Sequence, residues 1–106
     1  MIKHEEFVDC LRRRKRAKVV FVSQKDGGEL RERICAPMDY GPDRRAADKV
    51  NKYQFFDLDA GHPFMKLPDE IERFEVLDQD FDPADFVTWS LQLHPWSLDR
   101  EWGRYS

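Results

Sequence analysis

Two aspartates placed two residues apart, Asp57 and Asp59, are the first side chains in this 106-residue chain that could do chemistry. They close an aromatic segment, residues 52–59, whose composition predicts a β-strand. Side chains two apart on a strand point to the same face, and paired carboxylates can bind Mg²⁺ or carry out acid–base steps. Because no third ligand can be assigned from the sequence, a metal-dependent enzyme built on this pair is the least favoured of three functional hypotheses.

Other motifs for catalysis or cofactor binding are absent from the sequence, including glycine-rich phosphate loops and a nucleophile elbow. His4, His62 and His94 are far apart, and none lies at metal-ligand spacing from another histidine or a cysteine. The two cysteines, Cys10 and Cys35, form neither a CxxC pair nor a disulfide framework, so we interpret them as reduced, partly buried structural thiols. We therefore expect a cytoplasmic protein that is not an enzyme and holds no metal or cofactor.

The strongest electrostatic feature is a basic run that supplies Arg12, Arg13, Arg14 and Arg16 as candidate nucleic-acid-binding residues. Consecutive charges on a helix point around its circumference and cannot form a single stripe, so a solvated helix end is the simpler interpretation. The alternative is a patch that contacts phosphates independently of base sequence. Further basic residues could extend such a patch: Arg31, Arg33, Arg44, Arg45, Lys49 and Lys52.

Composition limits the class of protein. Hydrophobic residues make up 41% of the chain and aromatic residues 13%, which predicts one folded domain over residues 1–106. The net charge of −3 argues against binding nucleic acid with the whole surface. No apolar run approaches the roughly 20 residues that span a bilayer, so no membrane association is expected.

The elements that would position these side chains begin with a helix over residues 3–16, in which Phe7, Val8 and Leu11 fall on one side. A loop that includes one helical turn is expected over residues 37–51. Short connections favour antiparallel pairing of the strands. Apolar alternation and turn signals predict five strands, over residues 17–23, 29–36, 52–59, 64–67 and 71–77.

The C-terminal part begins with Asp82 as an N-cap, which predicts a short helix from Pro83 to Trp89. Residues 90–106 form an aromatic extension that we expect to pack on the domain, on another copy of the chain, or on a partner. The predicted fold is thus α+β, mainly β. It is a small, antiparallel, strongly bent sheet or SH3/Sm-like open barrel with an N-terminal helix and a short C-terminal helix.

The order of these pieces resembles the WYL domain family, which adds an SH3-like or Sm-like small β-barrel to many bacterial regulators. The similarity covers about residues 11–86 and is most specific near its end. There, a strand that opens at Ile71 is followed by Phe81-Asp82-Pro83-Ala84-Asp85-Phe86. The family's Trp-Tyr-Leu motif corresponds to Lys52-Tyr53-Gln54, and its arginine before the last strand corresponds to Met65 or Lys66.

The resemblance implies a regulatory or ligand-sensing module for nucleotides or nucleic acid, with Tyr53, Lys66 and Arg73 as its ligand-binding residues. The leading hypothesis is accordingly a non-enzymatic binding module that senses a small anionic ligand or contacts nucleic acid through arginine and lysine. The alternative is a protein-interaction or oligomerisation domain whose contact surface is the aromatic stretch from Leu91 to Tyr105.

Overall fold

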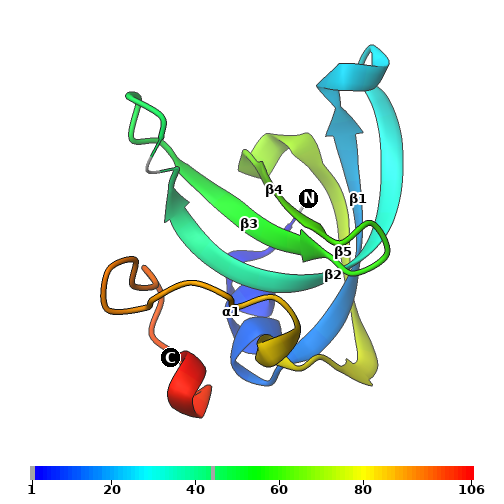
Figure 1. Ribbon diagram of the computed structural model, residues 1–106. Helices are drawn as coiled ribbons and strands as arrows, with labels where there is room; N and C mark the ends of the chain where they lie inside the picture. Colours follow the sequence, from blue (N-terminus) through cyan, green and yellow to red (C-terminus); the bar gives the residue numbers. More distant parts are fainter. Residues whose placement is uncertain (1, 44) are drawn as a thin grey trace.

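The computed structural model describes residues 2–43 and 45–106, so the expectation placed on Arg44 lies outside the described residues. An N-terminal helix and a five-stranded antiparallel sheet confirm the α+β, mainly β class (Figure 1). The strand order is β4-β3-β2-β1-β5, and the sheet is not closed into a barrel. The elements are α1 (His4–Arg12), β1 (Lys15–Ser23), β2 (Glu29–Pro42), β3 (Asn51–Asp57), β4 (His62–Lys66) and β5 (Ile71–Asp80).

The sheet curves, and the side on which its rings meet, here called the inner face, holds the aromatic core. Two strands separate β1 from β4, yet the ring centroids of Phe21 and Phe64 lie 4.6 Å apart. Helix α1 covers this face with Phe7, whose ring contacts Phe55 and Phe74. The predicted apolar side of the helix therefore packs on the sheet, as its spacing indicated.

The opposite side of β2 and β3, here called the outer face, is covered by the C-terminal segment, residues 81–106 (Figure 1). Side chains alternate along β3, so Phe55 faces α1 while Phe56 stacks on Phe86 with their centroids 5.1 Å apart. The segment also reaches α1, because Trp102 donates its indole N–H to the carbonyl oxygen of Leu11 at 3.0 Å. Of the three expected places for the aromatic extension, its own domain is the one that the structure shows.

The N-terminal helix is shorter than predicted. It ends at Arg12 rather than at residue 16, because Arg14 adopts a left-handed conformation with φ of 56° and turns the chain into β1. Positive φ is uncommon outside glycine, and the run of basic residues gives no sign of it. In the described part of the chain, no helix is both long enough and apolar enough to cross a membrane.

Two other predicted elements are wrong in extent. The expected loop over residues 37–51 begins later, because β2 continues as a strand to Pro42. No helical turn forms in the described part of that loop. The expected C-terminal helix is a single 3-10 turn, Pro83–Asp85, although Asp82 caps it as predicted by accepting the N–H of Ala84 at 3.0 Å.

One irregularity in β2 decides which side chains reach the outer face. Pro37 pairs with Phe55, and Asp39 pairs with Gln54, so Met38 is an extra residue in the pairing of β2 with β3. Such a bulge changes the direction of the side chains that follow it. Because Gln54 lies on the outer face with Phe56, Asp39 lies there too.

Candidate functional site

The ligand-binding residues implied by the resemblance are not gathered in one site. Tyr53 is buried on the inner face, and its hydroxyl lies 2.9 Å from Nδ1 of His4. Burial raises the pKa of Tyr53 above its ordinary value. Lys66 is the register partner of Tyr53, but its Nζ donates to the carbonyl oxygen of Val22 at 2.7 Å. Both side chains are thus engaged within the fold.

Arg73, the third of these residues, lies on the other side of the sheet. It pairs with Val20 of β1, whose neighbours Val19 and Phe21 face the core. The Arg73 side chain is 68% exposed and forms an ion pair with Glu75 at 3.0 Å. The backbone therefore separates Arg73 from Tyr53 and Lys66, and the three cannot contact one small ligand together.

The basic run is distributed over a helix end, a turn and a strand. Arg12 ends α1 and donates from Nε to the carbonyl oxygen of Asp99 at 3.2 Å. Arg13 forms an exposed ion pair with Asp9 at 3.4 Å. Each of these arginines is therefore already engaged within the chain.

The later members of the run contact the end of β5. Lys15 forms an ion pair with Asp80 at 2.6 Å, and Arg16 donates to the carbonyl oxygen of the same residue at 2.9 Å. Lys15 and Arg13 both help to lower the pKa of Asp80 below its ordinary value, and the hydrogen bond from Lys15 is the main cause. Carboxylates thus pair with Arg13 and Lys15, whereas Arg12 and Arg16 bond to backbone carbonyl oxygens.

The aspartate pair that could have supported acid–base chemistry is divided between a strand end and a turn. Asp57 is buried, and its Oδ1 accepts the backbone N–H groups of Asp59 and Ala60 at 3.0 and 2.9 Å. Its Oδ2 forms an ion pair with Arg33 at 3.3 Å. Asp57 thus shapes the turn after β3. Among the described residues, no three His, Cys, Asp or Glu side chains are grouped so as to hold a metal ion.

The two cysteines are fully buried core residues, more deeply buried than the partly buried thiols that the sequence predicts. Neither forms a disulfide, and Cys10 donates its thiol hydrogen to the carbonyl oxygen of Lys15 at 3.1 Å. Burial is the main cause that raises the pKa of Cys10 to about 12 and the pKa of Cys35 further still. A thiol that keeps its proton is a poor nucleophile, which fits a structural role.

One hollow of the structure lies beside the point where the C-terminal segment is fixed to the outer face through Asp39. This carboxylate is only 5% exposed. It accepts backbone N–H groups from Ser97 at 2.8 Å and from Leu98 at 2.9 Å. It also forms a buried ion pair with Arg100 at 3.2 Å. We call this set of contacts the Asp39 junction.

The buried side chain of Arg100 contacts a backbone carbonyl and two aromatic rings in addition to Asp39. Its Nη1 donates to the carbonyl oxygen of Met38, and its guanidinium carbon lies 4.0 and 4.4 Å from the ring centroids of Trp96 and Trp102. Burial lowers the pKa of Arg100 to about 10, against the opposing effect of Asp39. The group therefore remains a cation near neutral pH, and its charge is balanced by Asp39.

A glycine allows the segment to approach the sheet this closely. A side chain at Gly41 would place its Cβ 2.5 Å from Oγ of Ser97, well inside van der Waals contact. Gly41 pairs with Lys52, so it faces outward directly below the crossing segment. The close approach of Ser97 to β2 thus depends on the absence of a side chain here.

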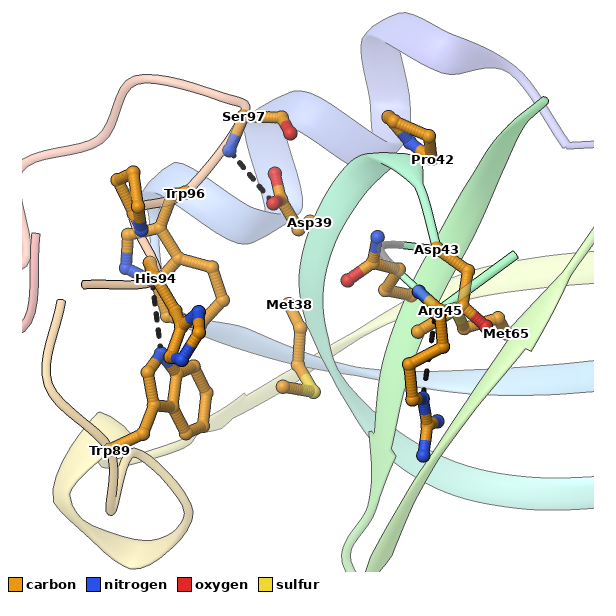
Figure 2. A pocket seen from close by; sticks show the side chains of 12 residues that line it. Met38, Asp39, Pro42, Asp43, Arg45, Met65, Trp89, His94, Trp96 and Ser97 are labelled. Atoms are coloured by element: carbon orange, nitrogen blue, oxygen red, sulfur yellow. Dashed lines mark hydrogen bonds and ion pairs between the residues drawn. The ribbon is translucent and has the colours of Figure 1, made fainter. Parts of the chain in front are cut away.

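Between the segment and the strands lies a cavity of about 480 Å³, within the range of small-ligand sites. Figure 2 shows its two walls: Trp89, His94 and Trp96 on the side of the segment, and Arg45 and Met65 on the opposite side. Met38 lies between the walls. The remaining lining residues are Asp39, Pro42, Asp43, Gln54, Pro95 and Ser97.

The aromatic wall offers carbon surface rather than hydrogen bonds. Trp89 donates its indole N–H to the carbonyl oxygen of His94 at 3.1 Å, and Trp96 donates its own to Tyr105 at 2.8 Å. The two indoles meet edge to face with centroids 5.2 Å apart. With both donors used inside the chain, these rings can contribute only π and apolar contacts to a ligand. The thioethers of Met38 and Met65 suit the same kind of ligand.

Comparison of this chain with models of protein families, with curated proteins and with solved structures found no match. Its function is therefore inferred from the chemistry of the cavity itself. Among the lining residues, sequence reasoning named Arg45 as part of the basic patch and Met65 as a counterpart of the family's arginine, but it missed Asp39 and its partner Arg100. The one usable signal was the aromatic content of the extension, which predicted that the extension would be packed.

Proposed function

We propose that the chain is a non-enzymatic binding module whose site is the cavity between the C-terminal segment and β2, β3 and β4. The observation that carries the proposal is a cavity of ligand size with two indoles on one wall, thioethers of two methionines, and a cation at its rim. A planar, mostly apolar molecule fits this lining, because flat π surfaces bind aromatic rings by stacking or edge contact.

The proposal keeps the ligand-sensing role implied by the resemblance to the WYL family and its small SH3/Sm-like open barrel. It places the binding site in the outer-face cavity instead of at Tyr53, Lys66 and Arg73. Lys66 and Tyr53 point into the inner face, whereas the cavity lies on the outer face. Met65, the other counterpart of the family's arginine, lines the cavity. A regulatory role would then arise through a change that ligand binding makes in the C-terminal segment.

Two alternatives have less support. Nucleic-acid binding by Arg12, Arg13, Arg14 and Arg16 would have to displace contacts that three of these arginines already make with the chain. Protein interaction through Leu91 to Tyr105 would use a stretch whose large apolar side chains, with one exception, are partly or fully buried against the domain. Leu93, which is 74% exposed, is the apolar residue in that stretch most open to a partner.

The test is calorimetric titration of the whole chain with naphthol, a flat neutral aromatic molecule. Met65→Trp should place an indole in the cavity and weaken binding, and the fold should tolerate it because aromatic residues are favourable on a β-strand. Val76→Trp is the matched control, because Val76 is a 39% exposed strand residue that does not line the cavity. If naphthol binds neither the parent chain nor the control, or binds all three proteins equally, the proposal is wrong.

A further inference from the structure

A second hollow adjoins the aromatic cavity and gives the site a polar end. It measures about 370 Å³ and shares Asp43, Arg45 and Met65 with the first cavity. Its other walls come from β4, from the turn after it and from Lys52 of β3. The two hollows therefore meet at Arg45, one lined by indoles and the other by charged side chains.

The cations in this second hollow are more available than the anions. The side chain of Lys52 makes no hydrogen bond or ion pair with any of the described residues, and the side chain of Arg45 is 89% exposed. Glu70 is engaged, because it accepts the backbone N–H of Leu67 at 2.9 Å. Asp43 accepts the backbone N–H of Arg45 at 3.0 Å, while the side chains of this pair are 3.7 Å apart.

We infer that the two hollows form one site for a planar aromatic ring that carries an anionic group. The ring lies against Trp89 and Trp96, and the anion lies between Arg45 and Lys52. This inference rests on the proposed function and specifies its ligand. Charge-assisted hydrogen bonds from a guanidinium and an ammonium are among the stronger polar contacts available to a phosphate or carboxylate.

The experiment compares ligands that contain one or both groups. Calorimetric titrations use naphthol, naphthyl phosphate, inorganic phosphate and naphthylmethylamine on the whole chain. Naphthyl phosphate should bind about tenfold more tightly than naphthol, which corresponds to roughly one charge-assisted hydrogen bond. Inorganic phosphate should bind far more weakly than either, because it lacks the ring.

Three variants with the same change of charge locate the anion. Lys52→Gln and Arg45→Gln should each remove most of the gain from the phosphate. Lys52 lines only the second hollow, so Lys52→Gln should also leave naphthol binding unchanged. Lys49→Gln is the control, because Lys49 is an exposed residue of the loop between β2 and β3, which also contains Arg45, and it lines neither hollow. These are surface substitutions, and circular dichroism spectra would confirm that all three variants fold.

The outcomes separate this inference from the proposed function. If naphthol binds but its phosphate gains nothing, or if the gain survives in both Lys52→Gln and Arg45→Gln, the anion site is wrong and the aromatic cavity stands. Tighter binding of naphthylmethylamine than of naphthyl phosphate would also overturn the anion site. If naphthol itself does not bind, the proposed function fails first.

A further titration with adenosine monophosphate distinguishes two sources of the same chemistry. Binding that weakens in Lys52→Gln and Arg45→Gln would identify a nucleotide as the kind of ligand. Binding of naphthyl phosphate without binding of adenosine monophosphate would instead indicate a simpler aromatic anion. Either result supports the shared chemistry of a ring joined to an anion.

Discussion

The two faces of the sheet are covered in physically different ways. On the inner face, α1 packs Phe7 against the rings of Phe55 and Phe74, and Leu11 of the same helix is fully buried. On the outer face, the C-terminal segment is fixed by a buried ion pair and by backbone hydrogen bonds to Asp39. The inner cover buries Phe7 completely, whereas the outer cover leaves a cavity beside its polar anchor.

The difference teaches that a directional anchor can hold a segment without filling the space around it. Apolar burial stabilises in proportion to the area removed from water, so it favours close packing. An ion pair with matched hydrogen bonds fixes one point of the segment. Phe86 and Trp102 add apolar contacts elsewhere, and the part between Trp89 and Ser97 arches over the cavity. Under the proposed function, the outer cover binds the ligand and the inner cover contributes mainly to stability.

The largest expected effect breaks the inner cover. Phe7→Ala removes a fully buried ring that contacts Tyr53, Phe55 and Phe74. Such truncations cost about 3–5 kcal/mol, a large share of the total stability of a small domain. Urea denaturation should show the loss simultaneously in circular dichroism and in tryptophan fluorescence. A loss below about 1 kcal/mol would contradict the central role of this ring.

A smaller and more local effect is expected when the Asp39 junction is broken. Arg100→Ala leaves Asp39 buried without its counter-charge, at a cost near the lower end of about 3–5 kcal/mol for a broken buried pair. The segment can undock to relieve part of this cost, so the sheet itself should lose less stability.

Fluorescence can separate the two covers, because all three tryptophans of the chain lie in the C-terminal segment. In Arg100→Ala, the fluorescence transition in urea should precede the circular dichroism transition, which marks the loss of two-state behaviour. Arg104→Ala is the control, because Arg104 is an exposed cation of the same segment and lies 5.5 Å from the Tyr105 ring centroid. Coincident transitions in Arg100→Ala would show that the segment and the sheet unfold as one unit.

The smallest expected effect is a dependence of the free energy of unfolding on pH, caused by Cys10 of α1 in the inner cover. The pKa of Cys10 is raised from 9.0 to about 12 by burial, so the unfolded chain loses this proton first as pH rises. The stabilising contribution of the neutral thiol is complete below the unfolded pKa and is lost progressively between the two values. The free energy of unfolding should therefore fall by about 1 kcal/mol from about pH 8 to about pH 10 through this group. Urea denaturation at both pH values measures the fall, which should be smaller in Cys10→Ala.

Much of the scaffold could be predicted from local patterns. The strands follow from apolar alternation, and the first hairpin follows from Gly27 and Gly28, which both adopt positive φ. The end of α1 could not be predicted, because Arg14 adopts a conformation that its residue type does not favour. The continuation of β2 was hidden by Pro37 and Gly41, which usually indicate a loop.

The candidate site was far less predictable, since it depends on residues that are distant in the chain. Asp39 and Arg100 are 61 residues apart, and no local pattern links an aspartate in an apparent loop to an arginine near the C-terminus. Lys52 and Arg45 did belong to the predicted basic patch, but as residues that contact nucleic-acid phosphates. Only the tertiary fold shows that they flank a hollow beside two indoles.

The extra residue in β2 has a consequence for how this domain could have acquired its second cover. Counted from Cys35 with strict alternation, Asp39 would share the inward direction of Pro37, and its carboxylate would enter the aromatic core. Met38, the extra residue, reverses the alternation of inward and outward side chains along β2. The part of β2 before Met38 therefore contributes to the core, and Asp39 after it faces outward and anchors the C-terminal segment. A change in length by a single residue, rather than a series of substitutions, would suffice to gain or lose such an anchor.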